Sequence, residues 1–518
     1  MTKPVFIRSP FALLPFLLLL GWKFLFFSLY QFKIEDLWHQ QQLAVHLAHG
    51  YGPGYLYATA ADVSQWYSEV LFKWPPLFSV LLAGLLRLTI PVGTATLLLA
   101  FVALLLLLSS IRSLVRQLQL SPAAQWLLWV LLLLNPVLTD LFSVTDLLSL
   151  GLWLTGLSLL MQVLLAGRKV PVVFLSVLLF LPAAFRYQYY PLILVLPVCV
   201  FLMGIMNRNK QLWKLGLLLT GGVLFFLLLQ VVILNYYAGS GAYLADVPGG
   251  SAKNLSRMTP FFLYSLAPVY LPVNLFAERA AYDVQHLYSL ASLISLLLFV
   301  LFLVLLLRHP ATGRQQVFRF MAVSSIAFLF VYLSGLSLLF REQINGNSTF
   351  TYVQEPRYWG LALVLLPLLF ALWMDAGFRS LLPQAALLAL LINLPPLAYR
   401  LYKTINDPAH PARYTNRTAF KIQTDRLIRQ NTAAYRKPVV LSCFDSDFAL
   451  FNYSSPYAIA SYDSLLNRGR IYASRPVWFY LITRDTLRPG EEQFIRNNSL
   501  QQKLREPGLY RLYVQPVR

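Results

Sequence analysis

The amino-acid sequence predicts a polytopic α-helical membrane protein with a small C-terminal α/β domain on the non-cytoplasmic side. Of 518 residues, 58% are hydrophobic and 12% are charged, whereas about 25% of the residues of a soluble protein are charged. The same figures exclude an intrinsically disordered chain, which needs low hydrophobicity and high charge. Runs such as 11–30 and 96–111 approach or reach the roughly 20 apolar residues of a membrane-spanning helix. The third observation is a change of composition after residue 402, which predicts the separate domain.

The formal net charge is +21. In a soluble protein this charge would suggest a nucleic-acid partner. In a membrane protein, Lys and Arg gather in short cytoplasmic loops and fix the topology. We therefore expect membrane lipids, and no nucleic acid, as partners of the basic residues. Cys199 and Cys443 form no disulfide framework.

Twelve apolar segments are candidates for membrane helices, although not every one has to cross. They lie near residues 11–30, 75–91, 93–112, 122–139, 143–166, 170–185, 189–206, 211–236, 284–308, 315–340, 357–375 and 379–401.

The charges of the short loops decide the direction of each span. Four loops are basic, and twelve alternating crossings from a cytoplasmic N-terminus would place all four outside. If segment 75–91 does not cross, all four lie inside. This segment is short and opens with Pro75-Pro76, so we predict an interfacial helix there and about 11 crossings in total. The basic residues are Arg112/Arg116, Arg168/Lys169, Arg208/Lys210/Lys214 and Arg308/Arg314/Arg319.

This topology divides the chain into a transmembrane domain, residues 1–402, and a soluble extracytoplasmic domain, residues 403–518. The first external loop, 31–92, belongs to the membrane domain and faces the same side as the tail. The tail contains 18 Lys+Arg and 9 Asp+Glu, and its apolar runs are of strand length. Strands are expected within 437–444, 475–484 and 508–517, and an amphipathic helix within 417–430.

The first external loop carries two adjacent carboxylates, Glu35 and Asp36, directly after the first span. Carboxylates at a membrane boundary are costly unless they are solvated or partnered, which makes them functional candidates. They could instead serve only to complement the positive end of a helix macrodipole. A helical pattern follows and ends at Gly50, and the pair as a whole favours function over the structural alternative.

The spacing of Asp36, Ala44, Leu47 and Gly50, followed by the Trp-Pro-Pro-Leu sequence that starts at Trp74, resembles the first external loop of the GT-C superfamily. These proteins are integral-membrane glycosyltransferases that use polyprenyl-phosphate sugars, and they include aminoarabinose transferases and protein O-mannosyltransferases. The resemblance covers roughly residues 1–400 and implies a GT-C-like fold. It also implies that Asp36 is the catalytic carboxylate, with Glu35 as the alternative one residue away.

Further segments resemble the same family. The resemblance implies supporting acidic residues in the turn 135–146 and at the start of a late span, and cations that contact the donor phosphate. The acidic candidates are Asp146, Asp140 and Glu355, and the cationic ones are Arg186, Arg257 (with Lys253 as its alternative) and Arg357. Helix capping explains Asp146 equally well, and contact with lipid headgroups explains each arginine alone. Arginine suits phosphate because its planar fork binds two oxygens.

Three histidines, His39, His46 and His49, also lie in the first loop. A metal site is one interpretation, and amphipathic residues on an interfacial helix are the other, which the sequence favours. We therefore predict no histidine metal site. Some relatives bind a divalent metal ion at the acidic residues, so Asp36 and Glu35 are where such a cofactor would bind.

Together these features predict a multi-pass enzyme of the cell or inner membrane. It would transfer a hexosyl or pentosyl group, with inversion, from a polyprenyl-phosphate donor to a lipid, glycan or protein acceptor on the non-cytoplasmic side. Asp36 would be the general base. The alternatives are a lipid-linked glycan transporter or flippase, and a glycan polymerase or ligase.

Overall fold

The computed structural model describes the greater part of the chain. The described residues are 17–18, 20–21, 24, 35–52, 54–69, 75–133, 135, 143–238, 246–248, 261–266, 284–309, 313–344, 347–350, 356–406, 423–430, 439–444, 456–483, 486–504 and 508–515. They form two compact units. Unit 1 comprises 1–31, 99–235 and 243–402, and unit 2 comprises 32–98, 236–242 and 403–518.

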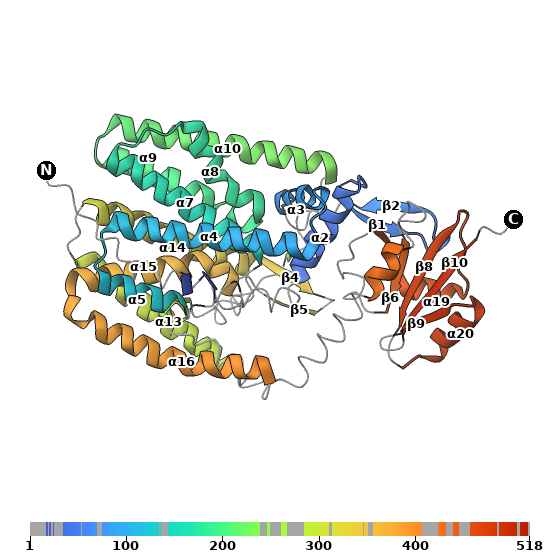
Figure 1. Cartoon of the computed structure of the whole chain (residues 1–518). Coiled ribbons are helices and arrows are strands. Elements are labelled where there is room, and N and C mark those ends of the chain that lie inside the picture. The colour runs from blue at the N-terminus through green and yellow to red at the C-terminus, as the bar shows by residue number, and fades with distance from the viewer. Residues whose placement is uncertain are drawn as a thin grey trace. The chain divides into compact units, whose positions relative to one another are not determined.

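Unit 1 is a bundle of long apolar helices (Figure 1). Its helices are α4 (Val92–Leu118, which begins in unit 2), α5 (Pro122–Leu133), α7 (Val144–Ala166), α8 (Val172–Phe185), α9 (Val195–Met206), α10 (Lys210–Ala238), α11 (Phe261–Leu266), α13 (Val284–Arg308), α14 (Gly313–Leu339), α15 (Gly360–Gly377) and α16 (Leu382–Asn406). Two 3₁₀ turns precede α9, and one precedes each of α15 and α16. A small sheet joins β3 (Asp246–Pro248), β4 (Phe340–Ile344) and β5 (Asn347–Phe350) in that order.

Seven helical segments among the described residues are long and apolar enough to cross a membrane, so the chain is an integral membrane protein. They are Val92–Leu118, Val144–Ala166, Tyr187–Met206, Lys210–Leu234, Leu290–Arg308, Gly313–Leu336 and Arg357–Gly377. Each coincides with a segment predicted from the sequence. The expected 11 crossings stay a prediction, since the first apolar run is largely outside the described residues and four further apolar helices are shorter.

One of these shorter helices is α3 (Leu77–Arg87), in the segment that we predicted not to cross. Its 11 residues span about 16 Å, roughly half of the apolar thickness of a bilayer. The length of α3 is therefore consistent with an interfacial helix.

The hydrogen bonds of α5 define two ends of the bundle. At one end the Ser121 backbone N–H donates to Asp375 Oδ2 (2.8 Å), and at the other Asn135 Nδ2 donates to Leu363 O (2.6 Å), so α5 and α15 are antiparallel. The α13–α14 turn lies at the Asp375 end, because His309 touches Gly377 there. As the chain alternates between the ends, the α4–α5, α7–α8 and α9–α10 turns return to the same end.

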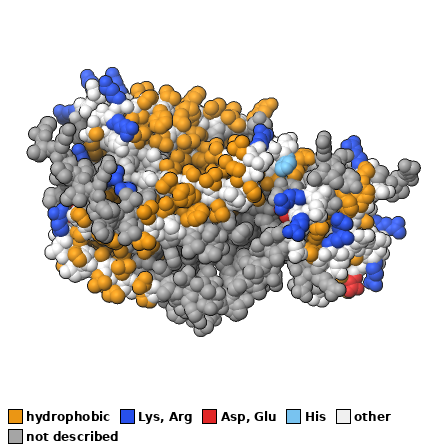
Figure 2. All heavy atoms as spheres, in the orientation of Figure 1, with side chains coloured by type: hydrophobic (Ala, Val, Ile, Leu, Met, Phe, Trp, Pro, Cys, Tyr) orange, Lys and Arg blue, Asp and Glu red, His pale blue; other side chains and the backbone are white. Residues whose placement is uncertain are grey.

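The four basic loops thus meet at one end of the helical unit. Figure 2 shows Lys and Arg side chains gathered at that end, beside a broad hydrophobic surface. The loop charges had predicted that all four basic loops lie at one end of the helical unit. The assignment of this end to the cytoplasm rests on the positive-inside rule and stays a prediction.

Small residues allow two neighbouring spans to approach closely. A Cβ atom at Gly204 in α9 would overlap the backbone of Trp213, and one at Gly216 in α10 would overlap the backbone of Phe201. Such close contacts are typical of membrane helices, which associate by packing rather than by a hydrophobic driving force.

Unit 2 is built around a seven-stranded mixed sheet with the strand order β2-β1-β7-β6-β8-β10-β9. Its strands are β1 (Tyr55–Ala58), β2 (Trp66–Glu69), β6 (Val439–Cys443), β7 (Tyr457–Ala460), β8 (Val477–Thr483), β9 (Gln501–Leu504) and β10 (Gly508–Val514). The helices are α2 (Glu35–Ala48), α3, α19 (Tyr462–Arg468) and α20 (Pro489–Asn497), and residues 423–430 are also helical. β1, β7, β6 and β8 are parallel, and the outer pairs are antiparallel.

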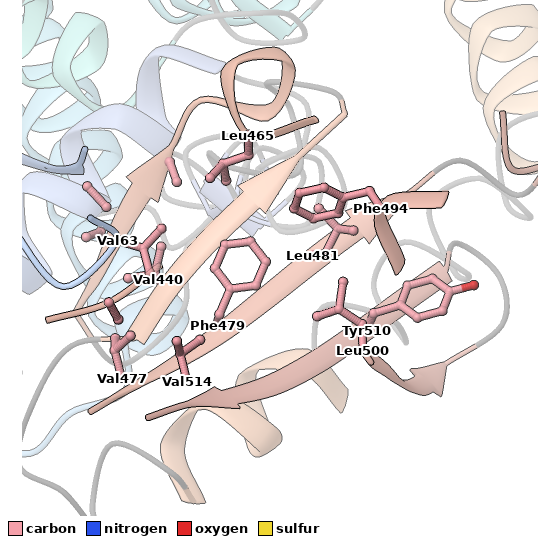
Figure 3. Packing of buried hydrophobic residues seen from close by; sticks show 14 of the residues in the cluster. Val63, Val440, Leu465, Val477, Phe479, Leu481, Phe494, Leu500, Tyr510 and Val514 are labelled. Atoms are coloured by element: carbon pink, nitrogen blue, oxygen red, sulfur yellow. The ribbon is translucent and has the colours of Figure 1, made fainter. Parts of the chain in front are cut away.

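Both faces of the sheet are covered. Figure 3 shows one face, where Phe479 of β8 packs among Val440, Leu465 and Phe494. The other face packs Tyr480 and its neighbours against Ile428 of the 423–430 helix. Burial on both faces explains why β6 and β8 are continuous apolar runs rather than alternating ones.

The predicted strands of the tail are confirmed as β6, β8 and β10, and the predicted helix as residues 423–430. The structure adds a feature that we did not predict, because β1 and β2 come from the first loop. Leu56 of β1 pairs in parallel with Ala458 of β7. The sheet therefore combines the tail, residues 403–518, with part of the loop that we had assigned to the membrane domain.

Candidate functional site

The two predicted catalytic carboxylates open helix α2. Glu35 is its first residue and Asp36 its second, and both side chains lie outside the described part of the chain. Acidic residues at this position complement the helix macrodipole. The helix ends beside Gly50, whose φ of +81° favours glycine. The predicted helical segment of the first loop is therefore confirmed.

Helix α2 is anchored by hydrogen bonds to α3 and to the start of α4. Gln41 Nε2 donates to Thr96 Oγ1 at the start of α4 (2.6 Å), and Ser79 Oγ of α3 donates to the backbone oxygen of Gln40 (2.9 Å). At the end of α2, Arg87 Nη2 donates to Leu47 O (3.3 Å). The helix that carries the acidic pair is thus held in place by hydrogen bonds to both α3 and α4.

His46 is part of this anchoring and is completely buried. Its Nδ1 lies 2.8 Å from Gly54 O, and its ring packs edge-on against Tyr457. Burial lowers the pKa of His46 and outweighs the nearby backbone carbonyls, which raise it. Our view of His46 as an amphipathic interfacial residue was therefore wrong, because its ring is packed between α2 and the sheet. His49 is exposed and contacts Val45 O.

In unit 1, the structure brings Asp146 and Arg186 together. Arg186 Nε lies 2.6 Å from Asp146 Oδ1, and the two side chains are 7% and 1% exposed. Asp146 Oδ2 accepts hydrogen bonds from Ser143 N (2.9 Å) and Ser143 Oγ (2.8 Å). Asp146 therefore caps helix α7 and also neutralises a buried cation.

The local sequence explains this pair. Ser143 and Asp146 form the capping box that starts α7, and Gly167 in the left-handed conformation ends the helix. The short turn makes α8 antiparallel, and Ser149 Oγ donates to Pro182 O near its end (3.0 Å). Arg186 follows the last residue of α8, where a helix macrodipole favours a cation, while Asp146 lies where it favours an anion.

Arg357 lies at the same end of the bundle, in the 3₁₀ turn Pro356–Trp359 that leads into α15. The start of α15 is beside Asn135, at the end of the bundle opposite the basic turns. Arg357 is partly exposed and lies over the Tyr358 ring, 5.2 Å from its centroid. Trp359 is buried and stacks on Phe261 of α11, with a centroid distance of 4.5 Å.

The remaining site candidates, Asp140, Lys253, Arg257 and Glu355, lie outside the described residues. The predicted convergence of Arg186 and Arg257 therefore stays a prediction. Within the described ranges, no group of three or more His, Cys, Asp or Glu side chains could hold a metal ion. A divalent ion at Asp36 and Glu35 stays an expectation, because these two side chains lie outside the described part of the chain.

A search of solved structures finds ArnT from Cupriavidus metallidurans, crystallised with undecaprenyl phosphate. The TM-score is 0.52 at 11% sequence identity, and the match covers 98% of each chain. The predicted resemblance is thereby confirmed as a similarity of fold to ArnT. No protein-family model matches the sequence, and no curated protein matches it significantly.

Proposed function

We propose that this protein is a membrane glycosyltransferase that moves a sugar from a polyprenyl-phosphate donor to an acceptor on the non-cytoplasmic side. The observation that carries the proposal is the shared fold, over 98% of both chains, with a protein that was crystallised with undecaprenyl phosphate. The seven apolar spans agree with a substrate that resides in the membrane.

In the proposed reaction, Asp36 takes the proton of the acceptor hydroxyl. The acceptor oxygen attacks the anomeric carbon and forms the new glycosidic bond. The bond between that carbon and the phosphate oxygen breaks, and polyprenyl phosphate leaves with the electron pair. A single displacement of this kind inverts the anomeric carbon.

The charge that develops on the leaving phosphate needs cations. Arg186 is the strongest described candidate because Asp146 fixes the orientation of its guanidinium in a buried site. A preorganised donor in a site of low dielectric stabilises charge better than a solvated one. Arg257, with Lys253 as its alternative, and Arg357 are proposed as further phosphate contacts, with Asp140 and Glu355 as supporting acids.

The test uses cell-envelope preparations that contain the protein together with the lipids, glycans and proteins that are its proposed acceptors. Undecaprenyl-phosphate hexoses and pentoses with a labelled sugar are added, and label transfer and undecaprenyl phosphate release are measured. Asp36→Asn should lower the rate by about 10² to 10⁴, because the amide cannot accept the proton. Glu35→Gln should have a milder effect, and equal protein levels by size-exclusion chromatography serve as the control.

Each other result has a definite meaning. If the two effects are reversed, Glu35 is the base and Asp36 is not. If both variants keep full activity, the catalytic role of this loop is wrong. Movement of the labelled lipid between leaflets without cleavage of the sugar–phosphate bond would identify a flippase and refute the enzyme.

A further inference from the structure

Helix α2 buries more polar atoms than its described surroundings satisfy. Gln40, Gln41 and Gln42 are only 3%, 5% and 1% exposed. The hydrogen bond to Thr96 explains Gln41. For Gln40 and Gln42, neither the side-chain nitrogen nor the side-chain oxygen has a hydrogen-bond partner among the residues that the structure describes.

Such residues are unfavourable for the stability of the unliganded protein. A buried amide that has given up its hydrogen bonds with water loses free energy unless the protein replaces them. Nearly all buried polar groups in proteins have a partner, which is protein, ordered water or a ligand. Methionine has a similar size and no such requirement. A glutamine at such a position therefore indicates a further partner, which is either ordered water or a ligand, and the place of each glutamine on the helix decides between the two.

Position on the helix separates the two glutamines. Gln40 lies four residues, one helical turn, after Asp36, so the two positions share one face of α2. Side chains of a helix lean toward its N-terminus, and Gln40 therefore extends over the turn that begins with the acidic pair. Gln42 lies about 120° from Asp36 around the helix, on the side of His46.

We propose that Gln40 is a substrate-binding residue that exchanges hydrogen bonds with a hydroxyl group of the transferred sugar. This inference rests on the proposed function. A sugar hydroxyl donates one hydrogen bond and accepts others, and the glutamine amide offers both complementary groups. The hydrogen bond of Ser79 Oγ to the Gln40 backbone holds this part of α2 in place, so the amide is preorganised for a ligand beside position 36.

The experiment compares Gln40→Met with the matched control Gln42→Met in the full-length protein in nanodiscs. The probes are undecaprenyl phosphate and an undecaprenyl-phosphate hexose or pentose that the wild type transfers. Gln40→Met should weaken binding of the sugar-bearing lipid about 5- to 10-fold and leave that of undecaprenyl phosphate unchanged. Gln42→Met should change neither affinity. Both variants should melt at the same temperature as the wild type or higher, because each loses two unpaired buried groups.

The inference is overturned if Gln40→Met keeps the wild-type affinity for the sugar-bearing lipid, or weakens both lipids equally. If Gln40→Met does not fold, Gln40→Asn keeps the amide one methylene shorter and should show the same selective loss. The proposed function is tested separately by Asp36→Asn. A wild-type-like Gln40→Met beside an inactive Asp36→Asn refutes only the role of Gln40.

Discussion

The buried pair of Asp146 and Arg186 allows a quantitative test of how the helical unit is held together. The perturbation is Asp146→Asn, which is nearly isosteric and keeps an oxygen that can accept the hydrogen bonds of Ser143. The change therefore removes the negative charge while it preserves the cap of α7. Arg186→Gln is the partner variant, and the double variant completes the cycle.

The expected magnitudes follow from burial. Since the two side chains are 7% and 1% exposed, either single variant leaves a charge buried without its counterion. Removal of one member of such a pair costs about 3–5 kcal/mol. The double variant buries no charge and should cost about as much as one single variant. The coupling free energy, which is the sum of the two single costs less the cost of the double variant, should therefore equal about one single cost, roughly 3–5 kcal/mol.

The assay is equilibrium unfolding in mixed detergent–SDS micelles, followed by tryptophan fluorescence. If the double variant costs the sum of the singles within about 0.5 kcal/mol, the two residues are independent and the reasoning is refuted. Arg186→Lys adds a functional comparison, because it keeps the charge and loses the planar fork. A phosphate role predicts weaker binding of undecaprenyl phosphate with nearly normal stability, whereas a purely structural pair predicts lower stability with unchanged binding.

Three further predictions concern other parts of the chain. Gly216→Ala should destabilise the protein by roughly 1–3 kcal/mol, because its Cβ atom would overlap the Phe201 backbone. The control is Gly221→Ala on the same helix, whose Cβ atom meets no atom within 4 Å and which should be neutral. Thermal unfolding in detergent compares the two variants. The pKa of Asp62 falls to about 2 because hydrogen bonds from Ser474 and Ser64 outweigh its desolvation by burial. Its stabilising effect should be present above its ordinary pKa and disappear as the pH falls through about 2, so the stability difference between wild type and Asp62→Asn should shrink between pH 6 and pH 2. A cysteine introduced at Arg116 should react with impermeant maleimide only from the cytoplasmic side, and labelling only from outside would reverse the predicted topology.

The sequence by itself determined the class of the protein and the places of its membrane helices. A run of about 20 apolar residues is a local property that needs no knowledge of its neighbours. The tail strands within 437–444, 475–484 and 508–517 were predictable for a similar reason, because strands buried on both faces are continuous apolar runs. The motif around Asp36 also suggested the fold that the comparison with ArnT confirmed.

Only the tertiary structure decided which distant residues meet. The pairing of β1 with β7 joins Leu56 to Ala458, and no local pattern specifies a strand partner about 400 residues away. Asp146 and Arg186 were each identified from sequence, but the antiparallel packing of α7 and α8 makes them a pair. The unpaired amides of Gln40 and Gln42 likewise become visible only when burial is known, because the sequence does not show whether a glutamine on a helix faces water or the protein interior.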